Sequence, residues 1–317
     1  MMSKDNNSID NKLSAESNYD YHVPVLLHEC VEALKIKPDG VYVDCTFGGG
    51  GHSREILKHL GPDGKLFVFD QDSDAIKNVP KDNRIFFIQQ NFRHLKKFLR
   101  VNKVNAVDGI LADLGVSSHQ FDEAERGFSI RYDGDLDMRM DKRESLTAAS
   151  IIESFSEKEL HLIFEKYGEV SNARTLARTI VAKRSIAQIK TIAQFKQAIQ
   201  SVVIGNPNKY LAKVFQALRI TVNDEMGALK EMLSQTTDLL KHKGRVAIIT
   251  FHSLEDRIVK NFFKNGSLDE IEADDVFGTR PESPFILVAK KPIVATDDEL
   301  KKNTRSRSAK LRVVEKK

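Results

Sequence analysis

Short apolar runs alternate with helical patterns along the first third of the chain. Four runs are mostly apolar and have little alternation: residues 41–47, 65–70, 84–90 and 107–115. Such runs are typical of parallel strands buried between two layers of helices. Between the first two runs, Ile56, Leu57 and Leu60 share one helical face, and Gly61 gives a stop signal. This rhythm predicts a doubly wound α/β sheet with right-handed crossovers.

The pattern changes after the fourth run. From about residue 144 to 221 the chain shows helical patterns and no convincing strand, whereas residues 244–251 form a further apolar run behind a long amphipathic helix. Residues 284–294 and 309–316 predict a final antiparallel pair of strands. The expected parts are a disordered leader, a two-part core and an inserted helical domain: residues 1–20, residues 21–135 with 222–317, and residues 136–221.

Composition restricts the class of protein. The 317 residues carry a formal net charge of only +4, so any basic surface must be local. Cys30 and Cys45 are the only cysteines, which excludes a disulfide framework and suits a reducing compartment. No apolar stretch approaches the roughly 20 residues that span a bilayer, and the N-terminus lacks a signal-peptide core. We expect a cytoplasmic protein without membrane association.

The predicted insertion is the local basic region. Between Lys166 and Arg219 there are ten lysines and arginines, and Glu169 is the only acidic residue. Helix-stabilising ion pairs do not explain such an excess, which favours a phosphate backbone as the partner. The alternative is an ordinary solvated helix face. The candidate RNA contacts are Arg174, Arg178, Lys183 and Arg184.

Four consecutive glycines, from Gly48 to Gly51, follow the first predicted strand. Bare backbone at this position lets N–H groups approach a ligand, whereas a tight turn would need fewer glycines. A dinucleotide fingerprint requires a third glycine where Ser53 stands, and no P-loop lysine closes the loop. These differences argue against a NAD-dependent oxidoreductase and against a nucleoside triphosphate site.

The ends of the next predicted strands indicate which ligand the loop holds. Asp70 ends the second run, where the ribose diol of an adenosine would lie. Phe92 follows the third run and could cover an adenine face, unless it belongs to the core. Asp113 lies at the end of the fourth run. Together with the glycines, these residues describe a site for S-adenosylmethionine.

Longer motifs resemble a known family, the ribosomal RNA small subunit methyltransferase H family. The resemblance covers about residues 22–314 and rests on HVPVLLHE, DCTFGGGGHS, FDQDSDAI, GILADLGVSS, RGFSIRYDGDLDMRMD, FQALRITVNDE and FHSLEDRIVKNFF. It implies a class I S-adenosylmethionine-dependent methyltransferase fold, Rossmann-like, with an inserted helical domain that recognises the RNA. It also implies methylation of N4 of cytidine 1402 in 16S rRNA, in the decoding centre of the 30S subunit.

The resemblance also assigns residues to the cofactor. The implied cofactor-binding residues are Gly50, Gly51, His52, Asp70, Phe92, Asp113 and Gln120. His52 has an alternative role, in capping or packing at the start of its helix. Methyl transfer requires no metal, and His22, His28 and Cys30 do not form a closed ligand set. A homodimer is left open.

Several residues are candidates to accept the amino hydrogens of the cytosine. Many amino-methyltransferases carry an Asp/Asn-Pro-Pro-aromatic motif after the fourth strand, whereas this chain has DLGVSS. Asp113 is the leading catalytic candidate. His252 and Ser253, after the fifth predicted parallel strand, are further candidates, although Ser253 with Asp256 also resembles a helix capping box.

Residues 126–141, RGFSIRYDGDLDMRMD, are punctuated by glycine and carry both charges, which favours an ordered loop over a cleft. A target base must leave its stack to reach the methyl group. Phe128 or Tyr132 would stack on that base, unless they belong to ordinary domain packing. A non-enzymatic RNA-binding protein would leave the glycine loop without a purpose. A small-molecule methyltransferase would not need the basic insertion.

Overall fold

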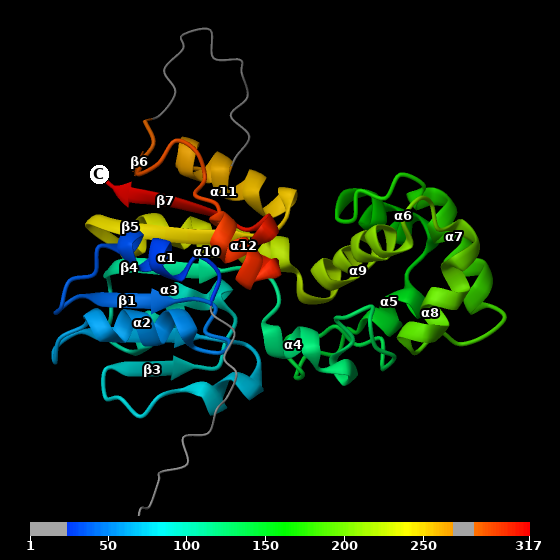
Figure 1. Ribbon diagram of the computed structural model, residues 1–317, viewed down its shortest axis with the longest axis horizontal. Helices are drawn as coiled ribbons and strands as arrows, with labels where there is room; N and C mark the ends of the chain where they lie inside the picture. The colour runs from blue at the N-terminus through cyan, green and yellow to red at the C-terminus, as the bar shows by residue number, and fades with distance from the viewer. Residues whose placement is uncertain (1–23, 269–281) are drawn as a thin grey trace, which may run out of the picture.

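A computed structural model describes residues 24–268 and 282–317, which form a seven-stranded sheet beside a helical unit (Figure 1). The leader predicted at residues 1–20 lies outside the described residues. The strand order is β3-β2-β1-β4-β5-β7-β6. The strands are β1 (Val41–Asp44), β2 (Lys65–Phe69), β3 (Ile85–Ile88), β4 (Val107–Asp113), β5 (Leu240–Thr250), β6 (Phe285–Leu287) and β7 (Lys310–Lys316).

The direction of the strands identifies the topology. β1 to β5 are parallel, whereas β7 runs antiparallel to β5 and pairs antiparallel with β6. This arrangement confirms the predicted doubly wound, Rossmann-like sheet of a class I methyltransferase and its antiparallel C-terminal pair. The connection between β2 and β3 contains a 3₁₀ segment, η1 (Ser73–Asn78), which ends two residues before Pro80.

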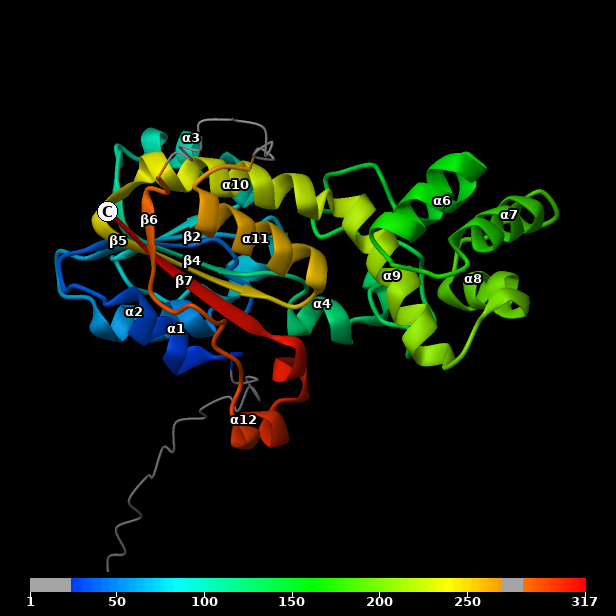
Figure 2. The same cartoon turned by 90° about the horizontal axis from the view of Figure 1, so that it is seen from above.

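The strands are apolar on both faces because helices cover both faces (Figure 2). In β2, Leu66 and Val68 join the core on one face, whereas Phe67 and Phe69 join the core on the other. The first face is covered by α1 (Leu27–Leu34) and α2 (Gly51–His59), and the second by α3 (Leu95–Val101), α10 (Glu225–Leu239) and α11 (Ser253–Asn265).

Most of the chain between β4 and β5 forms a helical unit with its own hydrophobic core, whereas α10 packs against the sheet. Its described residues from 136 to 221 contain no strand. The division into domains at residues 135 and 222 remains a prediction. The helices are α5 (Ala148–Ser154), α6 (Glu157–Lys166), α7 (Ala173–Arg184), α8 (Ile192–Ile199) and α9 (Pro207–Asn223).

Shorter elements complete the fold, and both cysteines are free and buried. Within the described ranges, no helix is both long enough and apolar enough to cross a membrane. The remaining elements are α4 (Ser118–Asp122), α12 (Asp297–Lys302), η2 (Phe92–His94), η3 (Ala124–Arg126), η4 (Gln200–Val202) and η5 (Thr304–Ser308).

Candidate active site at the strand ends

Three neighbouring parallel strands each place an aspartate at the same edge of the sheet. Asp44 is the last residue of β1, Asp113 is the last residue of β4, and Asp70 directly follows β2. β1 lies between β2 and β4 in the sheet, so the carboxyl ends of these strands meet on the side that faces the insertion (Figure 1). In open α/β sheets this edge is where ligands bind.

Asp44 fixes the loop that follows β1. It is buried, and its carboxylate accepts hydrogen bonds from the Ser53 hydroxyl (2.6 Å) and the Thr46 backbone N–H (3.0 Å). Ser53 lies in the first turn of α2, so the bond ties the helix to the end of the strand. Sequence reasoning gave Asp44 no role, although a buried acidic residue at the end of an apolar run was a usable signal.

Asp70 is held in place by two backbone donors. The Gly48 N–H donates to Oδ2 (2.7 Å) and the Asp72 N–H donates to Oδ1 (2.8 Å). Burial raises the pKa of Asp70 to about 6, although these two hydrogen bonds favour its charged form. Each carboxylate oxygen keeps a further lone pair for a ligand hydroxyl.

The glycines of the loop are required for different reasons. Gly50 has φ +74°, and a Cβ there would lie 2.7 Å from the Phe47 ring. A Cβ on Gly51 would overlap Pro24. Packing within the protein therefore excludes side chains at both positions, whereas a Cβ on Gly48 would meet nothing closer than Ser117 Cβ at 3.6 Å. Of these three glycines, Gly48 is the one where an added Cβ would make only an ordinary van der Waals contact.

Asp113 is the carboxylate with an unsatisfied oxygen. Within the described part of the chain, its buried Oδ1 has no hydrogen-bond partner. Its backbone N–H donates to Thr46 Oγ1 (2.6 Å), which fixes the end of β4 against the loop after β1. Burial, together with the nearby charges of Asp44 and Glu255, raises the pKa of Asp113 well above its usual value. Such a carboxylate can accept a hydrogen bond or a proton from a ligand.

His52 lies directly beside Asp113. Its Nε2 is 3.1 Å from the Val25 carbonyl oxygen, so Nε2 carries the proton. Its Nδ1 faces Asp113 Oδ2 at 3.9 Å. Burial lowers the pKa of His52, which leaves the ring neutral at pH 7. The ring does not cap α2, because Gly50 occupies the N-cap position and makes no side-chain bond.

Gln120 and Phe92 both have contacts within the protein. The buried Gln120 side chain donates to Asp72 Oδ2 (2.9 Å) and accepts from the Ser117 N–H (3.1 Å) in the capping box of α4. Phe92 is half-buried and packs against the core beneath α3 and α10. Gln120 therefore shapes the site through Asp72, whereas Phe92 keeps part of its surface free.

A buried ion pair at this edge was missed from the sequence. Arg126 Nη1 lies 2.7 Å from Asp72 Oδ2, and both side chains are almost fully buried. Arg126 Nη2 also donates to the carbonyl oxygens of Arg139 (3.0 Å) and Met140 (3.3 Å). Arg126 thus connects the loop after β2 to the far end of residues 126–141. No local sequence signal links positions so far apart.

The two aromatic candidates for base stacking differ in exposure. Phe128 is only 6% exposed and belongs to the core of the insertion, so the prediction that it stacks on a base is wrong. Its ring fills space between helices instead. Tyr132 is 50% exposed and remains a candidate.

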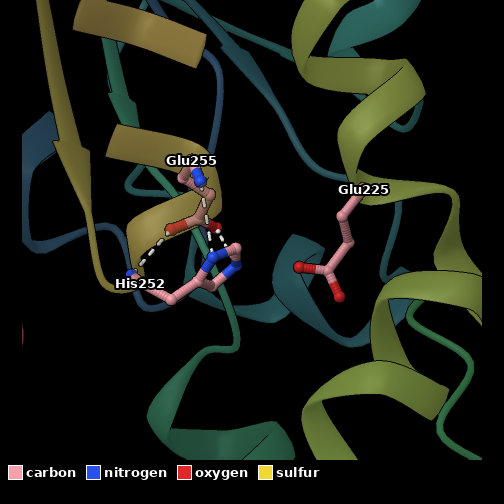
Figure 3. A group of neighbouring side chains, drawn as sticks. All are labelled: Glu225, His252 and Glu255. Atoms are coloured by element: carbon pink, nitrogen blue, oxygen red, sulfur yellow. Dashed lines mark hydrogen bonds and ion pairs between the residues drawn. The ribbon is translucent and has the colours of Figure 1, made fainter. Parts of the chain in front are cut away.

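The structure corrects the predicted cap of α11. Its N-cap is His252, which forms a capping box with Glu255, rather than Ser253 with Asp256. The Glu255 N–H lies 3.4 Å from His252 Nδ1, and His252 Nε2 lies 3.1 Å from Glu255 Oε1 (Figure 3). Asp256 instead accepts from Arg312 (2.6 Å). His252 therefore already has a structural role.

Glu225, His252 and Glu255 bring potential metal ligands within 4.8 Å of one another (Figure 3). Both oxygens of Glu225, however, accept hydrogen bonds from Arg219 (2.7 and 2.9 Å). Although burial opposes ionisation of Glu255, its bonds to His252 and the charge of Arg219 hold its pKa below the usual value. Arg219 already pairs with Glu225, and its charge also acts on Glu255, so the cluster is an ion-pair network between α9, α10 and α11.

More of the insertion's basic residues have partners within the protein than the sequence indicated. Several of these lysines and arginines form ion pairs or donate hydrogen bonds to backbone carbonyl oxygens. Arg174 and Lys183 are exposed, and no ion pair or side-chain hydrogen bond within the described residues engages them. The engaged residues are Arg178 (to Glu157), Arg184 (to the carbonyls of Ile152 and Phe155), Lys196 (to Ile130), Lys213 (to Glu169) and Arg219 (to Glu225).

Comparison with known proteins shows the family to which the chain belongs. Proteins named ribosomal RNA small subunit methyltransferase H are 54% identical in Bacteroides fragilis, over 95% of this chain and 99% of theirs, and 52% identical in Flavobacterium johnsoniae, over 94% and 98%. A solved rRNA methylase from Streptococcus thermophilus is 12% identical, covers 92% of this chain and 93% of its own, and superposes with a TM-score of 0.38, which is too distant to inform function. The model of the MraW methylase family matches residues 20–317, and the chain therefore belongs to that family.

Proposed function

We propose that this protein transfers a methyl group from S-adenosylmethionine to N4 of cytidine 1402 in 16S rRNA of the small ribosomal subunit. Membership of a methylase family and near-full-length relatives named as small subunit rRNA methyltransferases support this function. The observation that carries it is the buried, unpartnered oxygen of Asp113 at the end of β4. A 30S substrate places the enzyme in the cytoplasm.

The residues at the strand ends fit S-adenosylmethionine. The Asp70 carboxylate is fixed by two backbone donors and retains lone pairs that suit the two ribose hydroxyl groups. The bare backbone at Gly48 admits the methionine portion, and the free surface of Phe92 suits the adenine. We assign a supporting role to four further residues, which hold the surrounding loops through packing and hydrogen bonds within the protein: Gly50, Gly51, His52 and Gln120. When bound, the cofactor supplies an electrophilic methyl group.

Asp113 suits the chemistry of an exocyclic amine. The N4 lone pair of cytosine is delocalised into the ring, so the amine must become pyramidal before it attacks a methyl group. A hydrogen-bond acceptor on an amino hydrogen favours this change, and Asp113 Oδ1 is such an acceptor. Methylation leaves N4 with one proton in excess. A carboxylate whose pKa is raised accepts that proton more readily than an ordinary aspartate.

The insertion supplies the surface for the RNA. We assign the phosphate contacts to exposed basic residues that lack partners within the described structure, led by Arg174 and Lys183. Arg178 pairs only loosely with Glu157, at 3.8 Å between exposed side chains, and remains available. Arg184 contributes mainly to the fold, because its guanidinium joins α7 to the end of α5.

Labelled methyl transfer tests the function directly. The enzyme is incubated with tritiated S-adenosylmethionine and either 30S subunits or naked 16S rRNA, and the labelled nucleoside is identified and mapped. We expect N4-methylcytidine at a single position, with the Asp113→Asn protein as the inactive control. Label in a different nucleoside, or no label in either substrate, would contradict the proposal.

A further inference from the structure

Three segments that are distant in sequence meet at the ring of Phe121. Phe121 lies on α4, the helix that follows the Asp113 loop. The Cζ atom of Arg131, from residues 126–141, lies 5.9 Å from the centroid of this ring. The Cζ atom of Arg305, from η5 near the C-terminus, lies 5.6 Å from the same centroid. Two guanidinium groups therefore share one aromatic ring beside the candidate active site.

Arg305 anchors α4. Its Nη1 donates to the Ser118 hydroxyl, and its Nη2 lies 3.2 Å from each carboxylate oxygen of Asp122. Contacts to the first and last residues of α4 fix this short helix against the C-terminal segment. The charge of Arg305 is balanced by Asp122, so this residue acts mainly as a support.

Arg131 differs from Arg305 because its charge is not balanced. It is exposed, and within the described residues no ion pair or side-chain hydrogen bond engages its guanidinium. Asp133 is close in sequence, but no ion pair joins it to Arg131 within the described residues. Its Oδ1 instead accepts the backbone N–H groups of Gly134 (3.0 Å) and Ala193 (2.9 Å). Stacking on Phe121 orients the guanidinium while its in-plane N–H donors stay free.

We propose that Arg131 binds a backbone phosphate of the substrate RNA close to the target nucleotide. This inference rests on the proposed function. A planar guanidinium with free donors matches two phosphate oxygens. Phe121, on which Arg131 stacks, is eight residues from Asp113, a span of at most about 29 Å. A phosphate bound by Arg131 therefore lies within a few nucleotides of the base at Asp113.

This contact would also help to hold the target base out of its stack. A flipped nucleotide needs its backbone fixed on at least one side, because unstacking costs a few kcal/mol. Without such a contact, the flipped base could return to its stack. Arg131 fixes the backbone beside α4, which lies between the sheet and the insertion, whereas Arg174 and Lys183 act farther out on α7 (Figure 1).

The salt dependence of RNA binding tests the proposal. Affinity for 30S subunits is measured across a range of salt concentrations for the wild type, Arg131→Gln, Arg131→Lys and the control Arg100→Gln, an exposed arginine on α3. Arg131→Gln should weaken binding roughly tenfold and lower the slope of log affinity against log salt by about 0.7. Arg131→Lys should keep the slope, and Arg100→Gln should match the wild type. Cofactor affinity and melting temperature should stay unchanged in all four proteins.

The outcomes separate this inference from the function on which it rests. If the wild type methylates 30S subunits while Arg131→Gln keeps the wild-type slope, the phosphate contact is wrong and the function stands. A loss of melting temperature without a change in slope would show that Arg131 only packs on Phe121. Absence of methyl transfer by the wild type would overturn the function itself.

Discussion

At the scale of single residues, hydrogen bonding distinguishes two aspartates that look alike in the sequence. Asp70 and Asp113 both lie at the ends of parallel strands, and burial raises the pKa of both. Asp70 receives two backbone N–H groups, whereas Asp113 has a buried oxygen without a partner in the described structure. A buried carboxylate without donors is costly to ionise. Asp113 is therefore suited to proton transfer, and Asp70 to holding hydroxyl groups.

The first prediction concerns the pH dependence of methyl transfer. If Asp113 must be ionised to accept the amino proton, kcat should rise with pH through its raised pKa, because only the deprotonated form is the base. Asp113→Asn should lower kcat by roughly 10²–10⁴-fold and abolish this rise. Asp70→Asn is the control and should weaken cofactor binding while the pH profile remains. An unaltered profile in Asp113→Asn would exclude Asp113 as the base.

The second prediction concerns the stability of the glycine loop. Gly50→Ala should lower the free energy of unfolding by about 1–3 kcal/mol, because φ is +74° and the new Cβ would overlap the Phe47 ring. Gly48→Ala should cost less, because its Cβ has space beside Ser117 even though φ is also positive. Urea unfolding without cofactor measures both. If Gly50 were bare only to admit the ligand, Gly50→Ala would unfold like the wild type.

At the scale of elements, periodicity predicted the strands and most helices, but not their end contacts. The strands are apolar on both faces, and helices indeed cover both faces. The cap of α11 was missed because histidine is an unusual N-cap, whereas Ser253 with Asp256 matches a common pattern. The partners of Arg184 could not be predicted, because they are carbonyl groups, which every residue carries.

The third prediction separates structural from RNA-binding arginines on α7. Arg184→Ala should destabilise the protein by about 1–3 kcal/mol, because the carbonyl groups of Ile152 and Phe155 lose a charged donor at the end of α5. Arg174→Ala should leave stability unchanged and weaken RNA binding. Thermal unfolding and 30S binding are measured on both proteins. Equal loss of RNA affinity in the two variants, without loss of stability, would return Arg184 to the RNA surface.

At the scale of the whole molecule, polar side chains join the insertion to the sheet. Within the helical unit, Asn223 at the end of α9 accepts from the Met140 N–H (2.7 Å) and donates to the Met138 carbonyl (2.8 Å), which holds residues 138–140 against this helix. Arg126 pairs with Asp72 at the strand ends and donates to the far end of residues 126–141. These contacts depend on tertiary structure, so neither charge counts nor periodicity could predict them. Together they connect the helical unit to the loop beside Asp70.

The last prediction tests whether this connection is built on the Arg126–Asp72 pair. Arg126→Met should lower the free energy of unfolding by about 3–5 kcal/mol, because it leaves the Asp72 charge buried without its partner. Adding Asp72→Asn should recover part of the loss, since the uncompensated charge is then gone. Hydrogen exchange should quicken at residues 127–141 in Arg126→Met and stay slow in β1 and β4, whose ladders do not depend on the pair. Strictly additive effects of the two substitutions would show that Arg126 and Asp72 are not coupled.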